Sequence, residues 1–336
     1  MKLFGKQKYD FLGIGDIVTD DFIRIEEAEI LPASHDQGNL RLCLSFADKI
    51  PYKESYLVPA VGNSPNAVIA AARLGLKSAI LTNIGSDYHG GLCLEALKKE
   101  NVSTEFVAVN KNRKTNYHYV LWVKDDRTIL IKHEEYDYKL YNFGEPKWVY
   151  LSSLGQNSLP FHQELEEYFN KHPKIKLAFQ PGTFQIKFGK GALAGIYKRT
   201  DVFFCNKEES QRILETNESE IKNLLKMIAA LGPKIVVITD GVKGAYSYDG
   251  KETLSMRLYP DPAPPLERTG AGDAFSSTFT VALALNMSIR DALKWAPINP
   301  MSVVQQIGAR AGLLTRKELE EYLAKAPADY EPKILE

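Results

Sequence analysis

Residues 268–275 read Arg-Thr-Gly-Ala-Gly-Asp-Ala-Phe, a turn of small residues that leads directly into an apolar segment. The apolar side chains that follow recur at helical spacing, which predicts a buried helix over residues 274–285: Phe275, Phe279, Ala282 and Leu283. The first N–H groups of a helix have no intrahelical partner, and the helix dipole favours negative charge there. Gly270 and Gly272 let the backbone bend and leave no side chain in the way of a close ligand. The stretch therefore predicts a nest of amides for a phosphate or an oxyanion.

Asp273 lies in the first turn of this predicted helix, beside the expected anion site. An anion repels a carboxylate next to it, so the carboxylate needs a chemical reason for its position. A general base that takes the proton of a hydroxyl group attacking a phosphoryl group would supply that reason. The alternative is that Asp273 only complements the dipole of its helix and that the glycines form an ordinary tight turn.

The composition restricts the class of protein. The chain has 336 residues, with 42 basic and 42 acidic side chains, and this balance gives no broad electrostatic footprint for nucleic acid or anionic lipid. Three cysteines and six histidines are scattered without the spacing of a metal site or a disulfide framework. No apolar run reaches membrane-spanning length, and the first residues resemble the approach to a strand and not a signal peptide. We therefore expect a soluble, cytoplasmic protein without nucleic-acid or membrane partners.

The apolar run at residues 11–15 predicts a buried strand that is followed by a turn. A dinucleotide fingerprint would need a third glycine where Val18 stands and a helix afterwards, whereas residues 22–26 alternate like a second strand. We therefore reject a Rossmann dinucleotide site. Asp16 and Asp20 remain at the mouth of the first strand, where open α/β sheets bind ligands. The alternative is that each aspartate caps its own turn.

Two regions of β pattern interrupt a chain that otherwise alternates strand and helix. The expected strands of these regions, the last two of them joined as a hairpin, are residues 39–46, 52–58, 115–123 and 128–133. We expect a single domain over residues 1–336, with a small extra sheet formed by insertions at roughly 20–60 and 110–136. A sheet with one uncovered apolar face could act as a lid or as the surface of a homodimer.

The segment Val-Gly-Asn-Ser-Pro-Asn at residues 61–66 leads into an alanine-rich predicted helix. Ser64 as N-cap and Pro65 at the first helical position would give a good helix start. Gly62, Asn63 and Asn66 would then present small and amide groups suited to sugar hydroxyls. Simple capping is the alternative, but it explains the two asparagines poorly.

The second half of the chain repeats strand and helix, which predicts a parallel, doubly wound sheet. Asn206 and Glu209 directly follow one of its strands. They form a plausible capping box, while Glu209 could equally hold a hydrated Mg²⁺ ion near a phosphate. After the next strand, a turn punctuated by glycines could pass close to a nucleotide, although it would also serve as an ordinary hairpin. No Walker-type loop occurs in the sequence.

The order of these segments resembles that of the ribokinase-like (PfkB) family of carbohydrate and nucleoside kinases. Four segments carry the resemblance, and together they span nearly the whole chain: residues 15–20, 62–66, 206–209 and 269–273. The resemblance implies an α/β fold with a mainly parallel sheet flanked by helices and a β lid that closes over the sugar. It also implies an ATP-dependent kinase acting on a primary hydroxyl group of a sugar or a sugar-like compound, with Mg²⁺.

The same resemblance implies roles for individual residues. Asp273 would be the general base, with an anion hole formed by the turn at Gly270 and by the amides of Ala271, Gly272 and Asp273. Asp20, Gly62, Asn63 and Asn66 would contact the sugar, and the position of Asp16 at the mouth of the first strand adds it to this expected substrate site. Asn206 and Glu209 would organise Mg²⁺ and the triphosphate, with Glu209 acting through water. The residues that would hold the nucleotide are Thr239, Gly241, Gly244 and Asn299.

Several positions depart from the family pattern. Glu267 and Arg268 stand where many members have Asp-Thr, so a requirement for K⁺ is left open. Val61 replaces a usual glycine and Val18 a sugar-binding asparagine, so the sequence does not support ribose specificity. The alternatives are a nucleoside or sugar-phosphate kinase of the same fold, with lid aromatics such as Tyr117 stacking on a base, and a non-catalytic sugar sensor.

Overall fold

The computed structural model describes residues 8–33, 36–124 and 126–335. Within these residues a ten-stranded sheet dominates, in the order β16-β15-β14-β13-β12-β11-β10-β1-β6-β7. The strands from β13 to β7 are parallel, and β14, β15 and β16 extend the sheet by antiparallel pairing. The strands are β1 (Phe11–Ile14), β6 (Ser78–Gly85), β7 (Ser103–Asn110), β10 (Trp148–Leu151), β11 (Lys176–Phe179), β12 (Val202–Asn206), β13 (Ile235–Thr239), β14 (Ala245–Tyr248), β15 (Thr253–Met256) and β16 (Lys333–Ile334).

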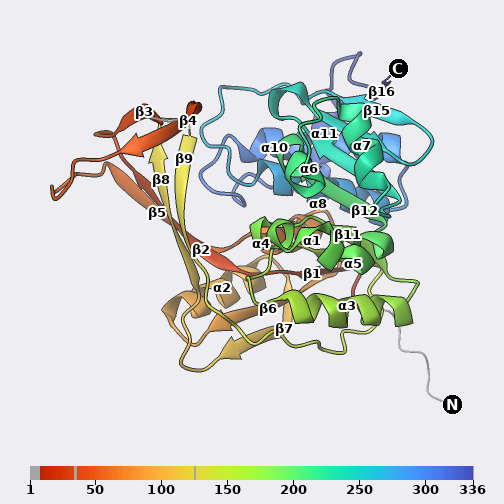
Figure 1. The fold of residues 1–336 in the computed structure, drawn as a ribbon, viewed down its shortest axis with the longest axis horizontal. Coiled ribbons are helices and arrows are strands. Elements are labelled where there is room, and N and C mark those ends of the chain that lie inside the picture. Colours follow the sequence, from red (N-terminus) through yellow and green to blue (C-terminus); the bar gives the residue numbers. More distant parts are fainter. Residues whose placement is uncertain (1–7, 34–35, 125, 336) are drawn as a thin grey trace.

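Helices cover both faces of this sheet (Figure 1). Every residue of β1, β6 and β10 is buried, as expected for parallel strands packed on two sides. Phe11 packs into one core and its neighbour Leu12 into the other, because successive strand side chains point to opposite faces. The first core contains α1 (Asn63–Arg73), α2 (Tyr88–Lys99), α8 (Ala271–Ala284), α9 (Ile289–Trp295), α10 (Ile298–Val303) and α11 (Arg316–Ala324). The second contains α3 (Leu159–Lys171), α4 (Thr183–Ala192), α5 (Ala194–Arg199), α6 (Lys207–Leu214) and α7 (Ile221–Ala229).

This arrangement confirms the expected mainly parallel, doubly wound α/β fold. None of the helices in the described ranges combines the length and the apolar composition that crossing a bilayer requires.

A second sheet of four strands stands beside the main body, in the order β5-β2-β8-β9 (Figure 1). Its strands are β2 (Val18–Arg24), β5 (Glu54–Val61), β8 (Asn116–Val123) and β9 (Asp126–Lys132). The hairpin of β8 and β9 is confirmed. The strand expected over residues 22–26 overlaps β2, which begins at Val18, where a dinucleotide fingerprint would need a glycine followed by a helix. These strands overlap the two segments expected to form a lid, and the closing motion of that lid stays a prediction.

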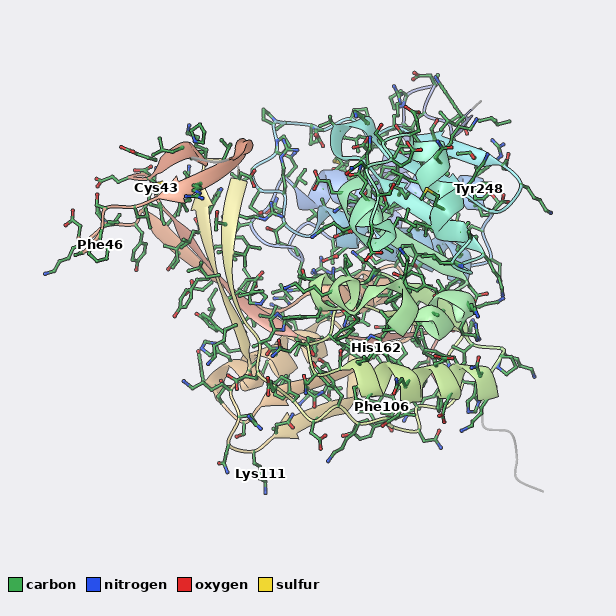
Figure 2. All side chains as sticks on the ribbon, in the orientation of Figure 1. Cys43, Phe46, Phe106, Lys111, His162 and Tyr248 are labelled. Atoms are coloured by element: carbon green, nitrogen blue, oxygen red, sulfur yellow. The ribbon has the colours of Figure 1, made fainter. Side chains whose placement is uncertain are left out.

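The expected strand over residues 39–46 is only partly present. Strand β4 (Asp36–Cys43) pairs with β3 (Glu29–Ala33) in a separate two-stranded ribbon, and the chain leaves the ribbon after Cys43. Leu40 and Leu44 are largely exposed, and Phe46 is 100% exposed and projects into solvent (Figure 2). The apolar alternation of this segment therefore covers no core within the described chain.

Candidate active site

The functional residues gather at one edge of the main sheet. Because β1, β10, β11 and β12 are parallel, their carboxyl ends meet at this edge. The start of α8 reaches the same place, since Gln180 directly after β11 hydrogen-bonds to Asp273. The fold thus brings together segments that lie far apart in the sequence.

Three side-chain amides surround the carboxylate of Asp273. Asn63 Nδ2 donates to Oδ1 at 2.6 Å, Asn66 Nδ2 donates to Oδ2 at 2.8 Å, and Gln180 Nε2 donates to Oδ1 at 3.1 Å. Burial of the carboxyl group raises the pKa of Asp273, the three amides oppose this rise, and the negative charge of Asp20 adds to it. The result is a carboxylate with fixed orientation and more basic than an ordinary aspartate.

The first turn of α8 offers backbone N–H groups to a ligand. Gly270 takes the N-cap position with φ 82°, and a Cβ there would lie 2.2 Å from the Cβ of Ala309, so only glycine fits. Within the described part of the chain, the N–H groups of Gly272 and Asp273 donate to no acceptor. A Cβ on Gly272 would meet open space. The helix therefore begins with free donors that face an unobstructed volume.

A buried glutamate supports this turn from behind. Glu267 is 1% exposed, and its Oε1 accepts hydrogen bonds from the N–H group of Thr269, at 2.6 Å, and from the Thr269 hydroxyl. Arg127, at the start of β9 in the second sheet, places its Nε 3.4 Å from the same oxygen. Glu267, one of the residues that depart from the family pattern, therefore pairs with a residue of the second sheet. The guanidinium of Arg127 links that sheet to the loop before α8.

Helix α1 begins differently from the sequence prediction. Ser64 is not the N-cap: Gly62 takes that position with φ 117°, and the Ser64 hydroxyl is buried against Ser152 Oγ at 2.7 Å. A Cβ on Gly62 would approach the carbonyl oxygen of Asp16 to 2.9 Å, which explains the glycine. With this start, Asn63 and Asn66 lie one turn apart on the same face, and both reach Asp273.

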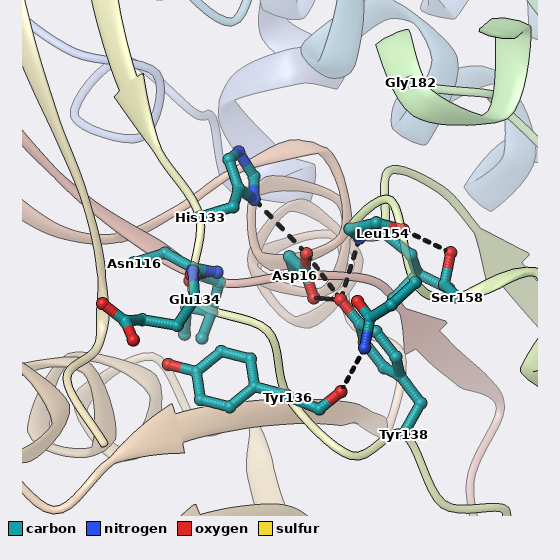
Figure 3. Close-up of polar contacts among 12 residues, drawn as sticks. Asp16, Asn116, His133, Glu134, Tyr136, Tyr138, Leu154, Ser158 and Gly182 are labelled. Atoms are coloured by element: carbon teal, nitrogen blue, oxygen red, sulfur yellow. Dashed lines mark hydrogen bonds and ion pairs between the residues drawn. The ribbon is translucent and has the colours of Figure 1, made fainter.

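Asp16 and Asp20 are buried, and each has a histidine beside it that sequence reasoning missed. His118 Nδ1 lies 3.2 Å from Asp20 Oδ1. His133 Nδ1 lies 3.5 Å from Asp16 Oδ2 (Figure 3). The Tyr138 hydroxyl donates to both oxygens of Asp16 at 3.0 Å. Burial, with the charge of Asp16, raises the pKa of Tyr138, which stays a donor. The histidines are scattered along the sequence and form no local motif. Only the alternation of side chains along β8 could have predicted that His118 faces the site.

Asn206 and Glu209 form a complete capping box at the start of α6. The N–H group of Glu209 donates to Asn206 Oδ1 at 2.8 Å, and that of Asn206 donates to Glu209 Oε2 at 2.9 Å. Burial raises the pKa of Glu209, and the charge of Asp273 contributes to the rise. The second carboxylate oxygen, Oε1, accepts no hydrogen bond within the described residues, so it is available to a ligand or to water.

A cavity of about 250 Å³ lies between the turn after β13, the start of α8 and α10. Gly241, in a 3₁₀ turn with φ 51°, and Ala271 lie in its wall. Thr239 and Gly244 lie outside it, and a Cβ on Gly244 would meet the carbonyl oxygen of Met256 at 2.2 Å. The other wall residues are mostly apolar: Val242, Leu258, Tyr259, Asp261, Pro265, Arg268, Pro297, Pro300, Met301 and Val304.

Asn299 does not present its side chain to this cavity. It is fully buried, its Nδ2 donates to Thr278 Oγ1 at 2.8 Å, and its Oδ1 accepts from the N–H group of Leu314 at 2.8 Å. Both ends of the amide are engaged within the protein. The structure therefore places Asn299 in the packing of α8 against α10, behind the wall of the cavity.

Comparison with known proteins gives a consistent result. Residues 44–316 match the model of the pfkB family carbohydrate kinases. Over 276 residues the chain is 29% identical to a ribokinase of Bacillus subtilis, covering 78% of this chain and 87% of that protein. The structure of Arabidopsis thaliana ribokinase complexed with ribose and ATP has a TM-score of 0.76 at 20% identity, covering 94% of this chain and 98% of the other. A putative ribokinase II from E. coli in complex with ATP and Mg²⁺ has a TM-score of 0.75 at 18% identity, covering 94% and 99%.

Proposed function

The chain belongs to the PfkB family of carbohydrate kinases and is a phosphotransferase with an alcohol acceptor, and we propose that it transfers the terminal phosphoryl group of ATP to a primary hydroxyl group of a sugar. The observation that carries this proposal is the position of Asp273. Three amides hold its carboxylate beside the free N–H groups that open α8. A base and an anion site in contact with each other are what phosphoryl transfer to a hydroxyl group requires.

In the proposed reaction, Asp273 takes the proton of the acceptor hydroxyl group. The hydroxyl oxygen forms a bond to the γ-phosphorus of ATP, and the bond from that phosphorus to the bridging oxygen breaks, which leaves ADP. The N–H groups of Gly272 and Asp273 donate to the phosphoryl oxygens as charge shifts among them. The raised pKa of Asp273 suits this role, because a general base works best when its pKa approaches the working pH.

The residues present fit ATP and Mg²⁺. The mostly apolar cavity next to Ala271 suits the base of the nucleotide, and Gly241 in its wall leaves room for a close ligand. No three His, Cys, Asp or Glu side chains of the described residues are arranged so that they could hold a metal ion by themselves. Mg²⁺ usually keeps several waters and takes few protein ligands. Glu209 Oε1 would hold such an ion through water. When bound, Mg²⁺ would neutralise charge on the transferring phosphate.

One observation favours a sugar over a nucleoside as acceptor. The rings of Tyr117 and Tyr119 pack against each other at 5.1 Å, and Tyr117 also packs against His89. Alternation along β8 places both tyrosines on the face opposite His118. Trp122 lies on the face of His118 but is buried under the guanidinium of Arg24. These aromatic rings therefore do not line up as a platform for a base beside Asp20.

The test is ATP consumption by the purified protein with ribose, fructose, adenosine and fructose 6-phosphate. We expect turnover with a free sugar, and a loss in Asp273→Asn of at least ~10²-fold, the lower end of what a positioned base contributes. Asp137→Asn, a substitution of an exposed aspartate, serves as the matched control. Near-normal turnover in Asp273→Asn, with an unchanged circular dichroism spectrum, would remove the base assignment. Tight sugar binding without ATP turnover in the unmodified protein would favour a sensor.

A further inference from the structure

Two imidazoles and two carboxylates form a continuous row beside the proposed acceptor site. The row runs Asp16, His133, His118, Asp20, with Nδ1-to-carboxylate distances of 3.5 and 3.2 Å at its ends. In its middle, His118 Nε2 and His133 Nε2 lie 3.4 Å apart. The four side chains come from four segments: the β1–β2 turn, the chain after β9, and strands β8 and β2. Local sequence does not explain such a convergence.

Each ring directs its Nδ1 atom at a carboxylate, His118 at Asp20 and His133 at Asp16. The two Nε2 atoms face each other, and each imidazole nitrogen can donate or accept a hydrogen bond according to the tautomer of its ring. In addition, Asp20 Oδ1 and His133 Nδ1 are buried without a well-aligned hydrogen-bond partner in the described protein. The row therefore has unused hydrogen-bonding capacity, and buried polar groups with such capacity call for a ligand.

The position of the row relates it to the reacting centre. Asp20 lies close enough to Asp273 for its charge to act on that carboxyl group. The carbonyl oxygen of Asp16 abuts Gly62, which begins the helix that carries Asn63 and Asn66. An acceptor with one hydroxyl group at Asp273 would therefore direct its other end toward the histidines. Both imidazole side chains retain exposed surface, 14% for His118 and 18% for His133.

We propose that His118 and His133 determine acceptor specificity by binding two adjacent hydroxyl groups of an uncharged sugar, which replace the contact between the two Nε2 atoms. This inference rests on the proposed kinase function. Hydroxyl groups suit the row because each can donate to an Nε2 atom and accept from a neighbour. A phosphate or carboxylate group on the acceptor would face Asp16 and Asp20 at the ends of the row. The acceptor is therefore a free sugar, and sugar acids and sugar phosphates are rejected.

The test compares His118→Gln and His133→Gln with His89→Gln, whose ring packs on the opposite face of the sheet against Tyr117. The sugar with the lowest KM is assayed together with its deoxy analogues, its acid and its phosphate. We expect each substitution at the row to raise KM on the order of tenfold with little change in kcat, as one lost hydrogen bond predicts. His89→Gln should leave KM unchanged. The deoxy analogue that lacks the hydroxyl group bound by one of the histidines should bind the unmodified protein more weakly than the parent sugar does. The variant that lacks this histidine should bind the analogue as well as it binds the parent sugar.

The outcomes separate this inference from the proposed function. Normal turnover in both variants with unchanged KM, or a preference for the sugar phosphate or acid, would overturn the inference alone. If the unmodified protein shows no turnover, calorimetric titration of the sugars decides: sugar binding weakened in His118→Gln and His133→Gln supports the row as a sugar site, and an absence of sugar binding overturns both proposals. The deoxy series on the unmodified protein keeps the test valid if either variant fails to fold.

Discussion

The amide cage around Asp273 makes a quantitative prediction about pH. Asn66→Ala removes the donor that contacts Oδ2 at 2.8 Å, and alanine keeps α1 intact because it is a good helix former. The Oδ1 atom of Asn66 has no partner in the described chain, so its removal breaks no other hydrogen bond. A hydrogen bond to a charged group contributes about 1.5–3 kcal/mol, and one pKa unit corresponds to about 1.4 kcal/mol. Losing this donor should therefore raise the pKa of Asp273 further, by about one to two units.

The assay is the pH dependence of kcat/KM for sugar phosphorylation, which reports the pKa of the essential base in the free enzyme. Activity falls as the pH drops through the pKa of Asp273, because the protonated carboxyl group accepts no further proton. The acid limb should therefore move to higher pH in Asn66→Ala by the same one to two units. Asn223→Ala, which removes an exposed asparagine bonded to Glu218, is the matched control and should leave the limb in place.

Stability supplies a second measurement that needs no turnover. A carboxyl group whose pKa is raised in the folded state binds its proton more tightly in the folded protein than in the unfolded chain. In its ionised form the group therefore lowers the free energy of unfolding. This loss disappears as the pH falls below the pKa of an aspartate in the unfolded chain, which is near 4. Asn66→Ala should increase this loss, so its decrease in unfolding free energy should be large at neutral pH and small at low pH. An unmoved acid limb together with a pH-independent loss of stability would refute the account of the cage.

Three further predictions test the parts around the cage. Gly272→Ala should stabilise the protein by up to about 1 kcal/mol, because residue 272 is helical and a Cβ there would meet open space. The same substitution should lower kcat/KM, because the added methyl group enters the volume proposed for the phosphate. Unchanged kcat/KM would count against the anion hole. Glu209→Gln keeps a residue suited to the capping box, so thermal unfolding should not change while half-maximal activity needs several-fold more Mg²⁺; an unaltered Mg²⁺ titration would leave capping as the role. Arg127→Ala leaves the buried carboxylate of Glu267 without its cation and should cost roughly 1–3 kcal/mol in chemical denaturation. Lys53→Ala, in an exposed ion pair, is the control and should cost clearly less. Equal losses in the two variants would contradict a stabilising role for the Arg127 contact.

Parts of the site could be foreseen because they depend on neighbours in the chain. The capping box of Asn206 and Glu209 spans three residues, and the glycine at position 270 follows from the turn into α8. The same local logic failed at α1, where Ser64 had the right chemistry for an N-cap. In the structure the Ser64 hydroxyl is buried against Ser152 and does not cap the helix. The N-cap is residue 62, where the positive φ favours a glycine.

What the sequence by itself determined is the set of local elements: the strands, the helices and the glycine turn before Asp273, because periodicity and backbone conformation act over a few residues. Only the tertiary structure decided which side chains meet. Asn63 and Asn66 reach Asp273 across 210 and 207 residues of chain. His118 and His133 likewise face each other only because β8 and the chain after β9 lie together beside β2. Such contacts depend on how the sheet and its helices pack, and no spacing along the chain encodes them.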